Sequence, residues 1–483
     1  MHLSVVLKVV GVLLMLFSFT MVPPFLVAII YDDAGDSVFL WSFSVTLISG
    51  MLCWFPVQHK DKELHTRDGF LVVVLFWSVL ALFGSLPFLI FKYPVMNFTD
   101  AFFESMSGLT TTGATILTGI DELPKSILFY RQQLQWLGGM GIVVLAVAVL
   151  PMLGIGGMQL YRAETPGPIK DSKLTPRITE TAKALWYIYL FLTITCALGY
   201  WLVGMSLFDA ISHSFTTVAI GGFSTHDTNI AYFNSLGVEI ITAIFMLVSA
   251  LNFGLHFYAW RSKNIKLYFS DPEVQTFFFV LISICLITCT YLILSGTYES
   301  WAEGIRYGLF EAISITTTTG YSVADFSSWP SLLPVLLLVG SFMGGCAGST
   351  GGGIKVIRVL LLYKQGLREI KRLLHPSAII LLKIGNKPVP DRVIEAVWGF
   401  LGVYLFLFIL LMLGINTTGL DFETSFSAVA ACLNNLGPGI GSVKDHYGDI
   451  SNGAKWILCF AMLLGRLEIF TLLVLINPMF WRH

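Results

Sequence analysis

The chain has 483 residues, of which 55% are hydrophobic and only 12% are charged. Its mean hydropathy is +0.76 and its formal net charge is −1. Soluble domains contain about 25% charged residues, so this composition predicts a polytopic membrane protein. The near-neutral charge gives no sign of a nucleic-acid partner. The seven cysteines show neither paired nor zinc-like spacing and are interpreted as small packing residues.

Ten segments are apolar and long enough to cross a membrane, which takes about 20 helical residues. The first is expected to break at Pro23-Pro24 and, lacking a cleavage site after it, to remain as an anchor. In chain order the segments are Leu3–Ile30, Val38–Val57, Gly69–Phe91, Ile127–Leu150, Ala184–Val203, Val238–Phe257, Phe277–Leu294, Leu332–Leu362, Val393–Ile415 and Ala454–Ile476.

Most of the 29 lysines and arginines lie in four loops on one side of these segments: His59–Asp68, Met158–Lys183, Ala259–Glu273 and Lys355–Arg392. Positive charge favours the cytoplasm, so both termini are predicted to be cytoplasmic. The loop Lys355–Arg392 is interpreted as a helix that extends past the membrane beside lipid headgroups. A docking surface for a cytosolic subunit is the alternative.

Four similar stretches lie between these segments: Asp100–Gly113, Asp209–Gly222, Tyr307–Gly320 and Thr424–Gly437. Each is a short run of small and apolar residues that ends on a glycine, and the glycines recur at intervals of 109, 98 and 117 residues. Such spacing indicates a duplicated unit of membrane helix, half-helix, loop and membrane helix. We therefore predict two extra N-terminal helices in residues 1–66 and pore repeats in residues 67–160, 161–260, 261–365 and 366–483.

Non-helical backbone at membrane depth is tolerated only inside protein or along a water-filled cavity. Four half-helices that converge on one axis would direct the negative ends of their dipoles at a cation, and loop carbonyls could replace its water. Packing of small residues alone explains one such stretch but not four in register. The predicted filter comprises Thr111, Thr112, Gly113, Ile220, Gly221, Gly222, Thr318, Thr319, Gly320, Asn435, Leu436 and Gly437. Glu104, His213 and Glu311 share one register, in which they either hydrogen-bond behind the filter or only cap polar contacts, and we favour the second interpretation.

Six motifs in this order resemble the Trk/Ktr/HKT superfamily of K⁺ transporters, and most closely its TrkH/TrkG type: TTTGAT (Thr110–Thr115), AIGGFST (Ala219–Thr225), TTTTGYS (Thr316–Ser322), GGCAGSTGGGIK (Gly344–Lys355), NNLGPG (Asn434–Gly439) and LLGRLEIF (Leu463–Phe470). The resemblance covers essentially the whole chain. It implies an all-α membrane protein with a pseudo-fourfold pore, K⁺ at the filter, and a homodimer in the bacterial inner membrane. A cytosolic nucleotide-binding ring of the TrkA type would be the regulatory partner, and any nucleotide would bind to that partner. Glycine at all four filter positions is the pattern of the K⁺-selective members.

Two further features are candidate gates. The middle of Leu332–Leu362 is rich in glycine, which disfavours helix, so the helix should break there. It is not a phosphate-binding loop, because no strand precedes it and Lys355 does not follow a glycine directly. The resemblance implies that this loop obstructs the pore, whereas a packing hinge is the alternative. The predicted gate residues are Gly344, Gly345, Gly348, Ser349, Thr350, Gly351, Gly352, Gly353, Lys355 and Arg466.

Arg466 is predicted to lie midway along Ala454–Ile476, where a charge costs at least about 3 kcal/mol. We interpret it as a positive charge at the pore, with a snorkelling arginine as the alternative and Glu468 as an uncertain partner. The sequence thus predicts a K⁺ uptake protein and not an enzyme. A secondary transporter that couples K⁺ to H⁺ or Na⁺ (a symporter) is the other hypothesis.

Overall fold

The computed structural model describes residues 2–60, 65–144, 178–385, 387–467 and 469–482. Within these ranges the regular secondary structure is almost entirely helical. The strands β1 (Lys383–Ile384) and β2 (Lys387–Pro388) pair as a hairpin with two residues in each strand. The predicted all-α polytopic fold is therefore confirmed. The loop Met158–Lys183 lies mostly outside the described residues, as do the end of the predicted segment Ile127–Leu150 and Glu468.

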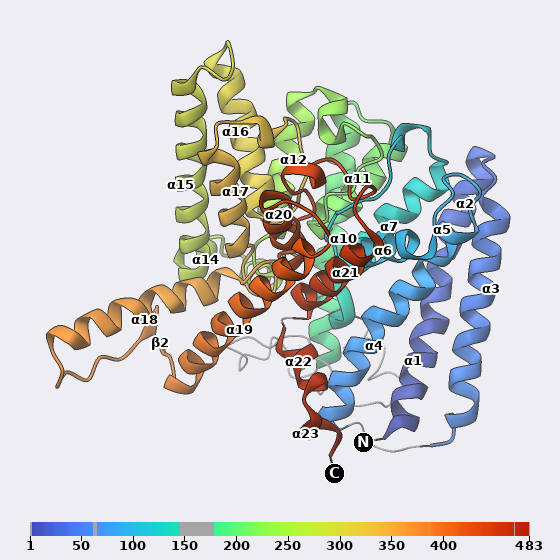
Figure 1. The fold of residues 1–483 in the computed structure, drawn as a ribbon, viewed down its shortest axis with the longest axis horizontal. Coiled ribbons are helices and arrows are strands. Elements are labelled where there is room, and N and C mark those ends of the chain that lie inside the picture. Colours follow the sequence, from blue (N-terminus) through green and yellow to red (C-terminus); the bar gives the residue numbers. More distant parts are fainter. Residues whose placement is uncertain (1, 61–64, 145–177, 386, 468, 483) are drawn as a thin grey trace.

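The N-terminal helices form a hairpin at one edge of the molecule (Figure 1). They are α1 (Leu3–Ser18), α2 (Val22–Tyr31) and α3 (Gly35–Trp54). Gly11 and Gly50 lie where α1 crosses α3, and a Cβ on Gly11 would meet the Gly50 carbonyl oxygen at 2.8 Å. Small residues thus allow close contact between the two backbones.

The interruption predicted at Pro23-Pro24 is present as a short 3-10 turn just before the prolines, which does not separate the two helices into different segments. The two prolines occupy the first turn of α2, where an N–H group is not needed, and a single 3-10 turn (Phe19–Met21) continues α1 into α2. The run Leu3–Tyr31 is long and apolar enough to act as one spanning unit.

The four repeats then follow with the predicted element order, and each half-helix is followed by a return loop that contains a short 3-10 helix. Repeat 1 contains α4 (Thr66–Gly84), α5 (Leu86–Ile90), half-helix α6 (Phe98–Leu109), η3 (Ile120–Glu122) and α7 (Lys125–Val144); repeat 2 contains α10 (Ile178–Leu202), half-helix α11 (Leu207–Ala219), η5 (Asn229–Phe233), α12 (Leu236–Ser249) and α13 (Phe253–Ser262). After α14 (Lys266–Ser270), repeat 3 contains α15 (Pro272–Ser295), half-helix α16 (Trp301–Thr316), η6 (Phe326–Ser328), α17 (Leu332–Met343) and α18 (Val356–Leu374); repeat 4 contains α19 (Asp391–Asn416), half-helix α20 (Phe422–Leu433), η7 (Gly441–Val443), α21 (Asn452–Arg466) and α22 (Phe470–Ile476), before α23 (Pro478–Trp481).

The helix after each half-helix is interrupted in all four repeats, although only the third interruption was predicted. In repeat 1 the interruption is a kink of α7 at Gly141 (φ 50°, ψ −156°), and in repeat 3 the glycine-rich segment separates α17 from α18. The angle between α12 and α13 is 92°, and that between α21 and α22 is 117°. The predictions of continuous helices over Val238–Phe257 and Ala454–Ile476 are therefore wrong.

These interruptions also change the count of spanning segments. Among the described residues, six helices are long and apolar enough to cross a membrane by themselves, and the two bent pairs raise the number to at most eight. The predicted number of ten spanning segments, two of them broken, is therefore not reached among the described residues. Arg466 is the last residue of α21, at a bend, and does not lie midway along a continuous helix.

Figure 1 shows the half-helices α6, α11 and α20 in the middle of the molecule, half-helix α16 beside α15 and α17, and α15 and the α1–α3 hairpin at opposite edges. α18 projects from the body together with the β hairpin. This projecting helix agrees with the helical interpretation of Lys355–Arg392. The beginning of α1 and the short helix α23 lie at the same end of the molecule, an arrangement compatible with termini on one side of a membrane.

Candidate ion site

The four half-helices begin in the same way. In each, a side-chain oxygen of the residue before the helix accepts a hydrogen bond from a backbone N–H group of the first turn. The four caps are Asn97, Ser206, Ser300 and Asp421. Asn, Ser and Asp are the preferred N-cap residues because they satisfy N–H groups that have no partner inside the helix. The sequence therefore fixes where each half-helix starts, and with it the direction of its dipole.

The half-helices also share one C-terminal geometry. In each, a residue with left-handed φ ends the helix. The N–H group of the next residue bonds to the carbonyl five positions back, which is the long bond of a Schellman motif. The left-handed residues are Thr111 (φ 54°), Ile220 (55°), Thr318 (66°) and Asn435 (52°). The long bonds run from Thr112 to Ser107 (2.9 Å), Gly221 to Thr216 (2.9 Å), Thr319 to Ser314 (2.8 Å) and Leu436 to Ala431 (2.7 Å).

Three of these left-handed residues are β-branched, which makes the conformation costly, by roughly 1–2 kcal/mol each. Such strain persists where the surrounding structure fixes it, and it is concentrated at functional sites. The sequence analysis missed this feature, because it attributed the turn to the glycines alone. The predicted glycines do adopt positive φ, but they lie two positions further on: Gly113 (81°), Gly222 (79°), Gly320 (77°) and Gly437 (99°).

Contacts between repeats close these four ends into a ring. A Cβ atom added to each glycine would collide with the carbonyl oxygen of the residue that precedes the glycine of the next repeat. The four pairs are Gly113 with Gly221 (2.2 Å), Gly222 with Thr319 (2.1 Å), Gly320 with Leu436 (2.1 Å) and Gly437 with Thr112 (2.6 Å). The order 1, 2, 3, 4 and back to 1 places the repeats around a single axis. We call Thr111–Gly113, Ile220–Gly222, Thr318–Gly320 and Asn435–Gly437 the carbonyl ring; it contains all twelve predicted filter residues.

The four sides of the carbonyl ring differ in their hydrogen bonds. The Gly221 carbonyl oxygen accepts a bond from Gln135 Nε2 (2.6 Å), and that of Gly437 accepts one from the Tyr447 hydroxyl (2.7 Å). A carbonyl oxygen has two lone pairs, so each keeps one for a further ligand. The hydroxyls of Thr112 and Thr319 bond to the threonines two positions earlier, at 2.7 and 2.8 Å. Gln135 and Tyr447 were not found from the sequence, since nothing in their own segments marks them.

A buried polar side chain in each half-helix holds the chain that returns from the carbonyl ring. Glu104 accepts from the Ile116 N–H (3.0 Å), Glu311 from the Val323 N–H (2.7 Å), and His213 Nε2 contacts Ser224 Oγ (3.0 Å). In repeat 4, Ser427 Oγ accepts from the Ile440 N–H (2.9 Å). Glu104, His213 and Glu311 therefore bond behind the carbonyl ring, which was the less favoured of the two interpretations of these residues.

The segment Gly344–Lys355, which we call the glycine loop, lies against the C-terminal ends of three half-helices. The Gly352 N–H donates to Thr318 Oγ1 (2.8 Å) and the Gly353 N–H to the Asn434 carbonyl (3.1 Å). Thr350 Oγ1 donates to the Val218 carbonyl (3.0 Å). A Cβ on Gly352 would lie 1.9 Å from the Asn434 carbonyl oxygen, so only glycine allows this approach. The loop is thus packed directly under the carbonyl ring, on repeats 2, 3 and 4.

Arg466 fills the remaining side, against repeat 1. Its Nη1 donates to Thr111 Oγ1 (3.1 Å) and to the Thr350 carbonyl (3.3 Å), and its Nη2 donates to the carbonyls of Gly138 and Gly139. These two carbonyls lie just before the kink of α7 at Gly141, so the guanidinium binds α7 where the helix is interrupted. Arg466 therefore joins the carbonyl ring, the kinked helix and the glycine loop, and the structure places all the predicted gate residues together.

Comparison with known proteins identifies this arrangement. Residues 35–483 match the TrkH family, described as a cation transport protein. The chain belongs to the TrkH family. Trk system potassium uptake protein TrkH of Halomonas elongata is 58% identical over 482 residues, and that of Escherichia coli K12 is 54% identical over 483; each match covers 100% of both chains. TrkG of Escherichia coli K12 is 42% identical over 481 residues, covering 100% of this chain and 99% of TrkG.

The fold of this TrkH-family chain agrees with a solved structure. The crystal structure of the potassium transporter TrkH from Vibrio parahaemolyticus superimposes with a TM-score of 0.91 at 55% identity, and the match covers 100% of both chains. The pseudo-fourfold membrane architecture expected from the repeats is therefore confirmed.

Ion pairs join neighbouring repeats of this TrkH-family chain at the N-terminal ends of the half-helices and in the return loops. Each of the four junctions has one. In the order 1–2, 2–3, 3–4 and 4–1, the pairs are His226 with Asp121, Arg306 with Glu239 (2.6 Å), Lys444 with Asp325 (3.1 Å), and Lys455 with Asp100 (2.7 Å). Three of these pairs use lysine or arginine, which stay charged near neutral pH. The 1–2 junction uses histidine, so it is the pH-sensitive one of the four.

His226 lies between two carboxylates. Its Nδ1 pairs with Asp121, its Nε2 lies 3.5 Å from Asp209 Oδ1, and its ring stacks on Tyr232 with centroids 3.4 Å apart. Burial alone would lower the pKa of His226, but hydrogen bonds and charge from Asp209 and Asp121 outweigh burial and raise this pKa above its usual 6.5. The protonated form is therefore stabilised in the folded protein.

We expect His226→Gln to lower the melting temperature in detergent at pH 6 and to have a smaller effect at pH 9. A raised folded-state pKa gives stability that is complete below the unfolded-state pKa and is lost as pH rises through the folded-state value. His446→Gln is the matched control. His446 lies in another return loop, and its acidic neighbour, the exposed Asp449, is 3.9 Å away, which is long for an ion pair. An equal loss at both pH values would show that His226 contributes by packing and not by charge.

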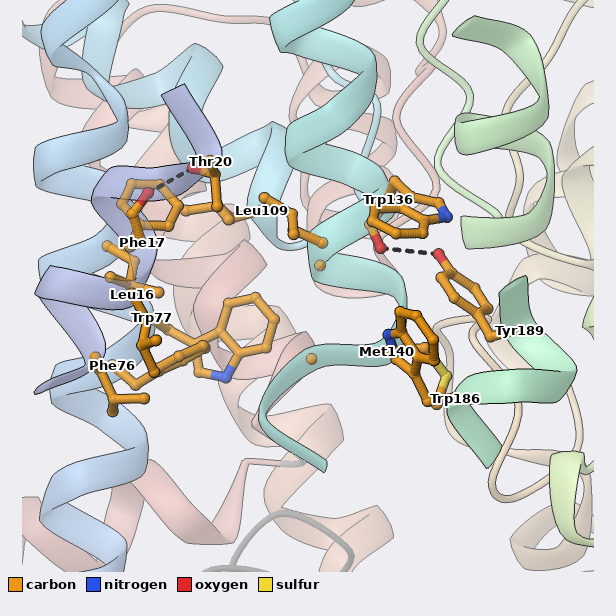
Figure 2. Close-up of a pocket in the computed structure, with 15 residues that line it drawn as sticks. Leu16, Phe17, Thr20, Phe76, Trp77, Leu109, Trp136, Met140, Trp186 and Tyr189 are labelled. Atoms are coloured by element: carbon orange, nitrogen blue, oxygen red, sulfur yellow. Dashed lines mark hydrogen bonds between the residues drawn. The ribbon is translucent and has the colours of Figure 1, made fainter. Parts of the chain in front are cut away.

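An apolar cavity of about 150 Å³ adjoins the Arg466 site (Figure 2). Figure 2 shows it between α1, α4, the end of α6, α7 and α10, with Trp77, Trp136 and Trp186 among its lining residues. The Trp77 ring is also 5.4 Å from the Arg466 guanidinium carbon. The guanidinium thus borders apolar surface on this side, and hydrogen bonds are stronger in such a setting than in water.

Proposed function

We propose that this protein takes up K⁺, as the names of its relatives say of them, and that the ion passes along the axis of the carbonyl ring. The single observation that carries the proposal is the closed series of contacts from each glycine to the carbonyl of the next repeat. A ring of backbone carbonyls around one axis can replace the water shell of a cation. Glycine in all four positions keeps side chains out of this ring. In the superfamily that the chain resembles, this is the pattern of the members that select K⁺ over Na⁺.

The polarity of the half-helices supports the same function. All four are capped at their N-termini and end at the carbonyl ring, so the partial negative charge of each C-terminus points at one place. Four such charges favour a cation at the ring. The Gln135 and Tyr447 bonds hold two sides of the ring in place without using the second lone pair of the carbonyl oxygen.

We further propose that the glycine loop and Arg466 form the closed gate. The loop occupies the space under three half-helices, and Arg466 places a positive charge at the fourth side, beside Thr111. A cation leaving the carbonyl ring would meet both. Opening then requires the loop to leave Thr318 and Asn434, two contacts that each consist of a single hydrogen bond from a glycine N–H group.

The remaining assignments are proposals of the same kind. Residues 1–66 would form an added hairpin, and residues 67–160, 161–260, 261–365 and 366–483 would form the four pore repeats of one protomer in a homodimer. The relatives are named as parts of a Trk system, which supports a cytosolic nucleotide-binding ring of the TrkA type as regulator. We place the protein in the bacterial inner membrane with both termini cytoplasmic and with lipid around the apolar helices.

Flux of Rb⁺, as a substitute for K⁺, in proteoliposomes tests the proposal. A membrane potential imposed without an H⁺ or Na⁺ gradient should drive Rb⁺ uptake that exceeds Na⁺ uptake. Uptake that requires an H⁺ or Na⁺ gradient would instead identify a coupled symporter and overturn the channel-like mechanism. Empty liposomes and liposomes with heat-denatured protein are the controls.

A further inference from the structure

The carboxylate of Glu273 links the glycine loop to α15. Glu273 lies in the first turn of α15, and its Oε1 accepts a hydrogen bond from the Ala347 N–H (2.7 Å), within the loop. The same oxygen accepts from the Ile357 N–H (3.2 Å), in the first turn of α18. These two N–H groups are ten residues apart, on either side of the part of the loop that contacts the half-helices.

The position of Glu273 suits a carboxylate. α18 starts at Val356 without a side-chain cap from its own preceding residue, Lys355. The first N–H groups of a helix have no partner inside it, and they carry partial positive charge. Glu273 supplies the missing acceptor from another helix, and a bond to a charged acceptor is roughly twice as strong as a neutral one.

Two bonds between the base of the loop and repeat 2 join backbone groups only. The Cys346 N–H donates to the Ala250 carbonyl (2.8 Å), and the Phe253 N–H donates to the Gly348 carbonyl (3.0 Å). Glu273 therefore differs from these partners, because its side chain can be displaced without moving the backbone of α15.

We propose that Glu273 is a positioning residue that holds the glycine loop in its blocking place and so sets the basal rate of ion flux. The inference rests on the proposed gating function of that loop. When the hydrogen bonds from the Ala347 and Ile357 N–H groups to Glu273 break, the loop loses its link to α15. The N-terminus of α18 then loses its acceptor. Movement of the loop and of α18 is thereby coupled through one side chain.

The test uses full-length protein in liposomes without any cytosolic partner. Glu273→Ala should raise basal Rb⁺ flux about tenfold, the factor that one charge-assisted hydrogen bond is worth. Glu273→Gln keeps an oxygen that can accept both bonds, so it should raise the flux far less. Glu303→Ala is the matched control, because Glu303 is an exposed carboxylate in the first turn of α16. Deletion of Ala347–Thr350 serves as the reference for an unblocked pore.

Cys346 gives a second readout that a merely structural role would not change. It lies in the glycine loop and is fully buried. With the other six cysteines replaced, the rate at which a maleimide labels Cys346 should rise in Glu273→Ala in parallel with the flux. We expect both rates to be restored towards wild type in Glu273→Gln.

Other outcomes overturn the inference in distinguishable ways. If the loop deletion raises flux but Glu273→Ala does not, Glu273 does not hold the gate, and the gate itself stands. If neither variant raises flux, the gating proposal fails and this inference fails with it. Lower flux with a lower melting temperature and unchanged Cys346 labelling would make Glu273 a stability residue only.

Discussion

Replacing Arg466 by alanine should make the protein conduct K⁺ about tenfold faster than wild type. The guanidinium donates to Thr111 Oγ1 in the carbonyl ring, so its charge lies next to any cation that leaves the ring. Two unit charges about 6 Å apart repel by about 3 kcal/mol at an effective dielectric constant of about 20. Screening by water in the pathway reduces this, and a barrier change of about 1.4 kcal/mol corresponds to the expected tenfold.

The measurement is Rb⁺ flux in liposomes together with the melting temperature in detergent. Arg466→Lys is the control, because it keeps the charge and should stay close to the wild-type rate. The opposite result has a clear meaning. If Arg466 mainly holds the structure, its removal takes away the hydrogen bonds that it donates to the carbonyls of Gly138 and Gly139. Flux and melting temperature would then both fall. The folding free energy would drop by roughly 3–5 kcal/mol if the charge has a buried ionic partner.

The second large effect concerns selectivity. Gly113→Ser should lower the ratio of Rb⁺ flux to Na⁺ flux about tenfold. Gly113 has a φ of +81°, and an added Cβ would lie 2.2 Å from the Gly221 carbonyl oxygen. The expected tenfold change corresponds to about 1.4 kcal/mol in relative affinity. The carbonyl must move, and with it one side of the carbonyl ring.

Gly119→Ser separates the collision from the backbone strain. Gly119 also has positive φ (+66°), but no atom lies within 4 Å of an added Cβ. Its variant should keep the wild-type flux ratio. An unchanged ratio in Gly113→Ser would remove Gly113 from the selectivity filter, and an equal loss in both variants would show that strain alone is responsible.

The half-helices could be predicted from the sequence because their signals are local. The caps Asn97, Ser206, Ser300 and Asp421 and the four terminal glycines each act on their own segment. The bend between α12 and α13 has no comparable signal. There the Ala250 carbonyl and the Phe253 N–H bond to Cys346 and Gly348 of the glycine loop, almost a hundred residues later. Contacts with another repeat impose this bend, so apolar periodicity in Val238–Phe257 could not reveal it.

The details of the candidate site depend on the same kind of distant contact. The glycines indicated where backbone would approach backbone, and that prediction located the carbonyl ring. The left-handed conformation of Ile220 could not be predicted, because a β-branched residue normally disfavours it. Arg466 was predicted as a pore charge, but its partners Gly138 and Gly139 lie more than 300 residues earlier in the chain, beside the kink at Gly141.

The carbonyl ring also affects how the chain is made. Its last contact joins Gly437 to the Thr112 carbonyl, two residues that are far apart in the sequence. Large proteins fold progressively as they are synthesised, from the N-terminal end. Repeats 1 to 3 can enter the membrane early, but the ring stays open on one side until the ribosome has delivered repeat 4. A nascent or truncated chain without repeat 4 therefore lacks one side of the carbonyl ring.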